Sequence, residues 1–112
     1  MFIRLFSYAS NELDSKQIVD NILKSINVYI DKVEFVSCKP YWKMSGVYEN
    51  EVRVVFKNDL TDVQLNTWLY DISDKWLYLG SPITEMLASE TTKDCHYIID
   101  GVSMINVILD DK

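Results

Sequence analysis

Residues 60–76 read LTDVQLNTWLYDISDKW, and this stretch carries the clearest start of a helix in the chain. Thr61 and Gln64 have the spacing of a capping box, in which each side chain bonds a backbone N–H at the helix start. Leu60 and Leu65 stand at the two positions of a hydrophobic staple around that box. Apolar residues then recur at helical spacing: Leu65, Trp68, Leu69, Ile72 and Trp76. The stretch therefore predicts an amphipathic helix with Trp68 and Trp76 in the core.

The residues before this helix predict three strands and a first helix. Residues 2–8 are mostly apolar and read as a strand, and Asp14 with Gln17 has the form of a second capping box. Isoleucines at a spacing of four then mark one helix face: Ile18, Ile22, Ile26 and Ile30. Residues 33–37 read as a strand that can extend to Trp42, and residues 47–57 read as a third, joined to it by a short loop at 43–46.

The residues after the helix predict a C-terminal hairpin. Gly80 and Pro82 end the helical region, and residues 83–90 fit a short helix or an irregular crossing equally. Residues 95–99 and 102–109 read as two strands, joined by Asp100 and Gly101 in a type I′ turn.

The resulting order is β-α-β-β-α-(x)-β-β, which predicts an α+β fold. The 112 residues fit one domain, spanning 1–112, with two helices packed on one antiparallel or mixed sheet. A ferredoxin-like core with an added strand fits this order.

The net charge of the chain disfavours some classes of binding partner and favours others. The net charge is −6, from 17 acidic and 11 basic residues. This charge disfavours direct binding of nucleic acid or of an anionic membrane, and it speeds association with a basic partner. The alternative interpretation is that the charge only keeps the protein soluble.

Two cysteines without a signal peptide indicate reduced thiols, so we expect a cytoplasmic protein.

No set of residues predicts catalysis. His96 is the single histidine, and in the predicted strand it points away from Cys95, so the two do not share a metal. A nucleophilic pair of Cys38 with His96 is not suggested by the strand order. Acidic pairs occur at Glu49 and Glu51 and on the second helix, where a solvated face is the simpler explanation. We therefore expect no enzyme, no metal, no cofactor and no small-molecule substrate.

Aromatic residues near carboxylates are the better functional signal, because such residues make up many binding hot spots. The first predicted patch joins the loop aromatics to the strand that follows: Tyr41, Trp42, Tyr48, Glu49 and Glu51. The alternative is that Tyr41 and Trp42 fold back over a sheet end. The second predicted patch lies on and after the second helix: Asp71, Asp74 and Tyr78.

In size, charge and α+β layout, the chain resembles the small acidic immunity proteins of bacterial contact-dependent growth inhibition and other polymorphic toxin systems. The resemblance extends over the whole chain and rests on no single motif. It implies one-to-one binding of a cognate basic toxin domain, typically a nuclease, whose active site or substrate surface is occluded. Two other functions stay open: a small ferredoxin-like ligand-binding domain or enzyme, and a structural homo-oligomer that pairs through an edge strand.

Overall fold

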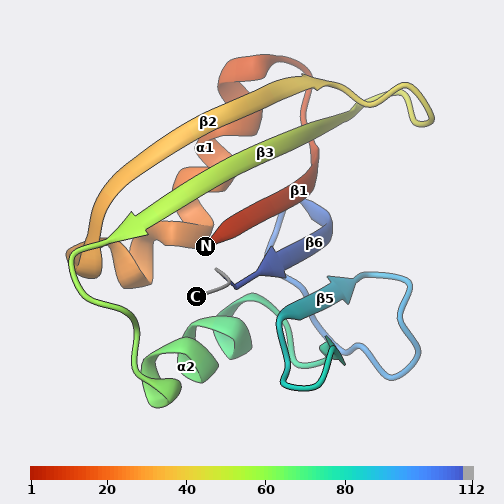
Figure 1. The fold of residues 1–112 in the computed structure, drawn as a ribbon. Coiled ribbons are helices and arrows are strands. Elements are labelled where there is room, and N and C mark those ends of the chain that lie inside the picture. The colour runs from red at the N-terminus through yellow and green to blue at the C-terminus, as the bar shows by residue number, and fades with distance from the viewer. Residues whose placement is uncertain (110–112) are drawn as a thin grey trace.

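The computed structural model describes residues 1–109, which form an α+β fold (Figure 1). All six strands belong to one antiparallel sheet in the order β2-β3-β1-β6-β5-β4. The elements in chain order are β1 (Phe2–Tyr8), α1 (Glu12–Leu23), the 3₁₀ helix η1 (Lys24–Tyr29), β2 (Ile30–Pro40), β3 (Val47–Phe56), α2 (Asp62–Ile72), β4 (Leu77–Leu79), β5 (Glu85–Ser89) and β6 (Val102–Ile108). The predicted α+β class, with two helices on a sheet, is confirmed.

Four of the strands have the ferredoxin-like arrangement. β1 lies between β3 and β6, and β2 lies outside β3. Because α1 connects β1 to β2 and α2 follows β3, the strands β2-β3-β1-β6 form the split β-α-β pattern. The β4–β5 pair is inserted between α2 and β6, and it lengthens the sheet beyond β6.

Both helices pack on the same face of the sheet, where the hydrophobic core lies. Ile3 and Leu5 of β1 are fully buried, and they share one cluster with side chains of α1 and α2. The indole N–H of Trp68 donates to the carbonyl of Ile22 at 2.7 Å, which ties α2 to the end of α1. Figure 1 shows α1 behind β2 and β3, so the face toward the viewer has no helix over it. No helix within residues 1–109 has the length and apolar character that a membrane crossing requires.

The first helix begins earlier than its sequence pattern predicts. Asn11 is its N-cap, and the Asn11 side chain accepts the backbone N–H of Asp14 at 2.8 Å. The predicted capping box of Asp14 and Gln17 is therefore wrong, because Asn11 caps the helix one turn earlier and Asp14 lies within the first turn. The isoleucine stripe also ends sooner than predicted, since Ile30 is the first residue of β2.

The second helix begins as predicted and ends earlier. The Thr61 hydroxyl accepts the N–H of Gln64 at 3.1 Å, and the Gln64 side chain accepts the N–H of Thr61 at 2.9 Å, which confirms the capping box. Trp76 lies beyond the helix end, yet it is buried. Its indole N–H donates to the carbonyls of Leu69 and Ser73. The Leu69 carbonyl also accepts the backbone N–H of Ser73, so the indole adds a second donor at the helix end.

The predicted C-terminal hairpin is wrong. Residues 95–99 form no strand and contribute one isolated bridge, between Ser73 and Ile98. The strand β6 pairs instead with β1 and β5, and β5 lies within residues 83–90, which the sequence left undecided. Only Gly101 has a positive φ at the turn, whereas a type I′ turn needs positive φ at both central residues. Ile105 and Val107 are fully buried, so their burial at the sheet centre decides the pairing.

Candidate functional site

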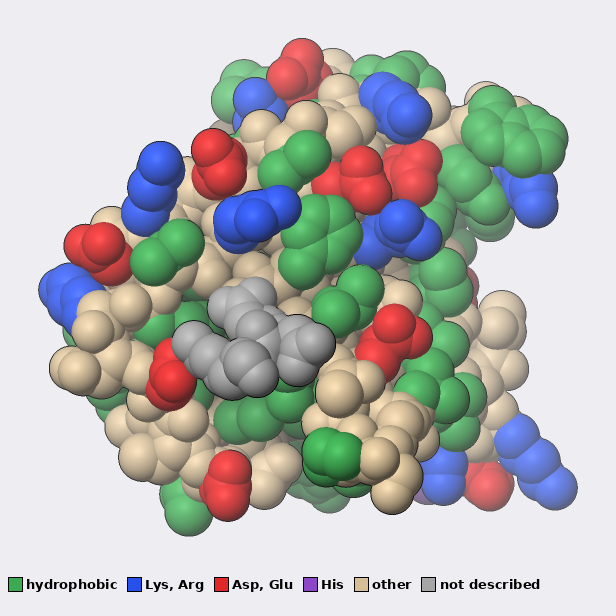
Figure 2. Space-filling view, viewed as in Figure 1, with side chains coloured by type: hydrophobic (Ala, Val, Ile, Leu, Met, Phe, Trp, Pro, Cys, Tyr) green, Lys and Arg blue, Asp and Glu red, His purple; other side chains and the backbone are tan. Residues whose placement is uncertain are grey.

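The face of the sheet opposite the helices is the scaffold of the candidate site. Alternate residues of β1, namely Arg4, Phe6 and Tyr8, lie on this open face, and the register places Glu49 and Glu51 of β3 beside them. Figure 2 shows this face with acidic and basic side chains interspersed over β2 and β3, and with hydrophobic side chains at the tip of the β2–β3 hairpin.

The hairpin tip presents two aromatic residues in different ways. The Tyr41 ring packs edge-on against Phe6, with ring centroids 4.8 Å apart, so Tyr41 folds back over the sheet as the alternative interpretation expects. Trp42 does not fold back, because 83% of it is exposed. The ammonium group of Lys43 lies 5.0 Å from the centroid of the Trp42 ring. At the hairpin tip, Tyr41 therefore packs against the sheet, whereas the indole of Trp42 is exposed to solvent.

A hollow of about 320 Å³ lies between this hairpin and the end of β5. We call it the aromatic hollow; its walls include Phe6, Tyr8, Tyr41, Met44, Glu90 and Met104. The Tyr8 hydroxyl donates to the Glu90 carboxylate, with O–O distances of 2.7 and 3.0 Å. One carboxylate is thus fixed at the rim of a mostly apolar space.

Sequence reasoning missed most of these residues, because the hollow is assembled by strand pairing. Phe6 and Tyr8 come from β1, whereas Glu90 follows β5, more than eighty positions later. One signal was available: on the face that does not hold Ile3 and Leu5, β1 carries three aromatic residues, Phe2, Phe6 and Tyr8, with Arg4 between them. A strand whose two faces are both apolar is expected to contact something on each face.

The predicted first patch divides between the two faces of the sheet. Glu49 and Glu51 lie on the open face, where Arg4 approaches them to 3.9 and 3.3 Å. Tyr48 is opposite Ser7, and Ser7 hydrogen-bonds Ser15 of α1. Since residues paired across an antiparallel ladder share a face, Tyr48 lies on the helix side, away from the two glutamates.

A buried amide fixes the register that orients the two glutamates. Asn50 is fully buried between them. Its side chain accepts the Ser15 hydroxyl at 2.9 Å and donates to the Leu5 carbonyl at 3.2 Å. A slip of β3 by one residue would break this network and move Glu49 and Glu51 to the core side.

The second predicted patch gathers around the end of α2. Asp74 follows the helix, and its carboxylate accepts the His96 imidazole at 2.7 Å and the backbone N–H groups of His96 and Tyr97 at 3.0 and 3.2 Å. Tyr97 packs edge-on against Tyr70, and its hydroxyl donates to the Tyr70 carbonyl. Asp71 is exposed on α2.

Tyr78 lies apart from these acidic groups. It is exposed on the edge strand β4, opposite the buried Met86. Within residues 1–109, no hydrogen bond joins Tyr78 to Asp71 or Asp74. The patch is therefore made by Tyr70, His96 and Tyr97 in place of Tyr78.

The hydrogen bonds of Asp74 change its acidity. Desolvation of the carboxyl opposes its charged form, but hydrogen bonds from the His96 imidazole and from the two backbone N–H groups outweigh it and lower the pKa of Asp74 to about 2. Burial raises the pKa of the Tyr97 phenol, and the nearby Tyr70, Asp74 and Asp71 add to that rise. Asp74 is thus an anion that anchors residues 96 and 97.

Within residues 1–109, no hydrogen bond joins either cysteine to the His96 ring. The Cys95 sulfur lies near the Ser73 hydroxyl and the Tyr97 carbonyl, while the His96 ring bonds Asp74. Cys38 is half-buried in β2, and burial raises the pKa of its thiol. In the part of the chain that the structure describes, no three His, Cys, Asp or Glu side chains converge as a metal site would require.

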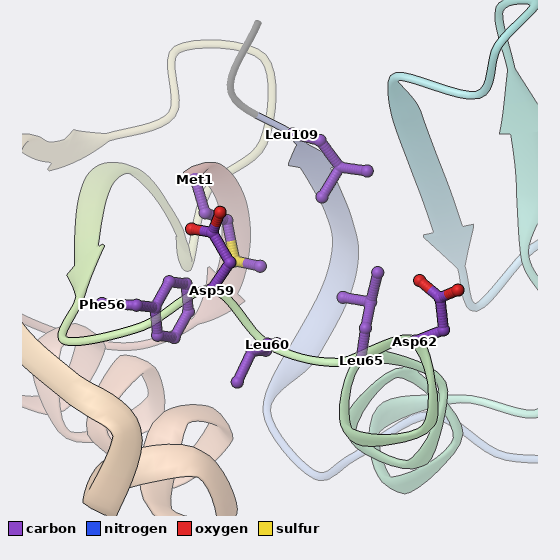
Figure 3. Close-up of a pocket in the computed structure, with 7 residues that line it drawn as sticks. All are labelled: Met1, Phe56, Asp59, Leu60, Asp62, Leu65 and Leu109. Atoms are coloured by element: carbon purple, nitrogen blue, oxygen red, sulfur yellow. The ribbon is translucent and has the colours of Figure 1, made fainter. Parts of the chain in front are cut away.

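A second hollow, of about 250 Å³, lies between the end of β3 and the start of α2 (Figure 3). Leu60 and Leu65, the staple residues, form part of its wall, and Leu109 closes another side. Figure 3 shows Asp59 and Asp62 on opposite sides of the space, so their carboxylates do not converge. This hollow lies where the start of α2 meets the ends of the interior strands β1, β3 and β6.

Comparisons with protein-family models, with curated proteins and with solved structures each found no match for the chain. The geometry of the open face therefore carries the functional proposal alone.

Proposed function

We propose that this protein is an immunity-type inhibitor, which binds a cognate basic toxin domain and occludes its active site or substrate surface. The observation that carries the proposal is the open sheet face that ends in a hairpin with Trp42 at 83% exposure. Tryptophan is among the residue types that dominate binding energy when a partner buries them. In the free protein its exposed indole contributes little to folding.

The base of the hairpin supports this role because it is already ordered. Val47 is buried, and its carbonyl accepts the N–H of Tyr41 at 2.8 Å. Together with the contact between Tyr41 and Phe6, this fixes the base of the hairpin before a partner arrives. Preorganisation of this kind lowers the conformational entropy that binding would otherwise cost.

Charge supports a basic partner. The net charge of −6 steers a cationic protein toward the molecule, and Glu49 and Glu51 lie on the proposed binding face. We further propose that the toxin is a nuclease and that this protein acts in the cytoplasm. In this proposal the protein itself uses no cofactor, does not contact nucleic acid directly and catalyses no reaction.

The test first asks whether the neighbouring gene encodes a toxin domain, as the proposal predicts. Co-expression with that domain is expected to restore growth, and calorimetry on the purified pair is expected to show one-to-one binding. Trp42→Ala should weaken binding about thirtyfold or more. Val63→Ala is the matched control, because Val63 is an apolar residue at 75% exposure on α2. This variant should bind the toxin domain with the affinity of the parent protein. Toxicity that persists at full expression of this protein contradicts the proposal.

A second candidate function rests on the edge strand β4. Leu77, Tyr78 and Leu79 are all exposed there, and an exposed apolar edge can pair with a second copy of the chain. The opposite edge, β2, carries charged residues and two register shifts, which discourage pairing. Light scattering on the purified protein distinguishes the candidates, since a monomer at working concentration rules out the homo-oligomer.

A further inference from the structure

We infer that the aromatic hollow receives an arginine side chain of the partner protein. This inference rests on the proposed function, because it names the chemistry by which the open face would hold a basic toxin domain. It goes further by assigning one anchor residue type to one hollow of the sheet face.

Among the described residues 1–109, no cation–π contact involves a ring of the hollow. Phe6 and Tyr41 meet edge-on at 4.8 Å, and Tyr8 stands beside them in the same wall. Within residues 1–109, the two cation–π contacts involve the Phe35 and Trp42 rings, neither of which lines the hollow. Phe6 is only 8% exposed, so a cation from outside would contact Tyr8, which is 44% exposed, and the half-buried Tyr41.

Glu90 supplies the opposite charge at the rim. The Tyr8 hydroxyl holds its carboxylate through contacts of 2.7 and 3.0 Å. In the described part of the chain Glu90 makes no ion pair, whereas Glu49 and Glu51 are both approached by Arg4. A carboxylate has about four acceptor sites, so most of those on Glu90 stay available after the bond from Tyr8.

These features select arginine among the side chains of a partner. An apolar side chain would bury Glu90 without a counter-charge, which is costly. A guanidinium group can stack on an aromatic ring and donate two parallel hydrogen bonds to a carboxylate. Met44 and Met104 give the methylene stem apolar contact, and a space of about 320 Å³ accommodates it.

The experiment titrates the ¹⁵N-labelled full chain with N-acetyl-arginine methylamide and follows amide shifts by NMR. Saturable shifts are expected for residues 41–47 and 89–91, in the millimolar range. The citrulline counterpart, which has nearly the same shape without charge, and the norleucine counterpart should bind much more weakly. Glu90→Gln keeps an acceptor for Tyr8, so the fold is retained, and it should weaken arginine binding about tenfold. Glu85→Gln, on β5 but outside the hollow, is the matched control and should bind like the parent protein.

Three results overturn the inference: no saturable shifts with arginine, equal binding of citrulline or norleucine, or an equal loss in both glutamate variants. The outcomes also separate the two proposals. Absent arginine binding with Trp42-dependent toxin binding intact overturns this inference alone. Arginine binding in a protein that neutralises no toxin overturns the proposed function alone.

Discussion

Replacing Trp68 with Phe tests whether one buried hydrogen bond joins the two helices. Trp68 is 1% exposed, and its indole N–H donates to the Ile22 carbonyl at 2.7 Å. Phenylalanine cannot donate, so that carbonyl is left buried and unpaired at a cost of about 1–3 kcal/mol. The smaller ring also leaves a void, which adds about 1 kcal/mol. We therefore expect the free energy of unfolding to fall by about 2–4 kcal/mol, a large part of a typical total of about 5–15 kcal/mol.

Urea unfolding followed by far-ultraviolet circular dichroism measures this loss. The midpoint should move to lower urea while the slope stays unchanged, because the surface exposed on unfolding is nearly the same. Trp42→Phe makes the same chemical change at an exposed site, and it should shift stability by less than about 0.5 kcal/mol. A similarly small effect of Trp68→Phe would mean that the hydrogen bond to Ile22 contributes almost nothing to stability, contrary to this prediction.

Two further predictions concern Asp74 and the turn glycines. The folded pKa of Asp74, about 2, lies below its ordinary 3.8, so its interactions stabilise the fold above pH 3.8, and this contribution is lost as the pH falls toward 2. Asp74→Asn should therefore lower the melting temperature at pH 7, and the gap from the parent protein should shrink by pH 2; a gap that stays constant over this range contradicts the prediction. Gly101 has a φ of +88°, and an added Cβ would lie 2.8 Å from Ile18 Cδ1, whereas Gly46, with a φ of +80°, has open space around it. Both alanine variants pay for the positive φ, about 1–2 kcal/mol, but calorimetric melting should show Gly101→Ala about 1 kcal/mol worse, and equal losses would argue against the clash.

The parts of the fold that sequence predicts well are those set by local chemistry. Thr61 and Gln64 specify the start of α2 with atoms only three residues apart, and the alternation in residues 47–57 specifies β3. The predicted cap at Asp14 was wrong because Asn11, a competing cap one turn earlier, is satisfied by the same helix. Local sequence patterns therefore show where a helix or strand lies, but nearby residues that can also cap a helix decide where it begins.

The parts that sequence predicts poorly depend on contacts distant along the chain. Asp100 and Gly101 have hairpin chemistry, but the partners of β6 are β1 and β5, chosen by burial at the sheet centre. The candidate site was hard to predict for the same reason. Tyr48 was predicted to lie with Glu49, but the strand register places it on the other face of the sheet. Glu90 contacts Tyr8 because β6 pairs with both β1 and β5.

The central claim is that the open face and its hairpin bind another protein. Amide hydrogen exchange on a complex with the cognate toxin domain is the decisive test. We expect residues 41–49 and 89–91 to exchange more slowly in the complex than in the free protein, and the exposed face of α2 to exchange at an unchanged rate. Protection confined to α2, or no protection anywhere in a complex of proven one-to-one stoichiometry, would contradict it.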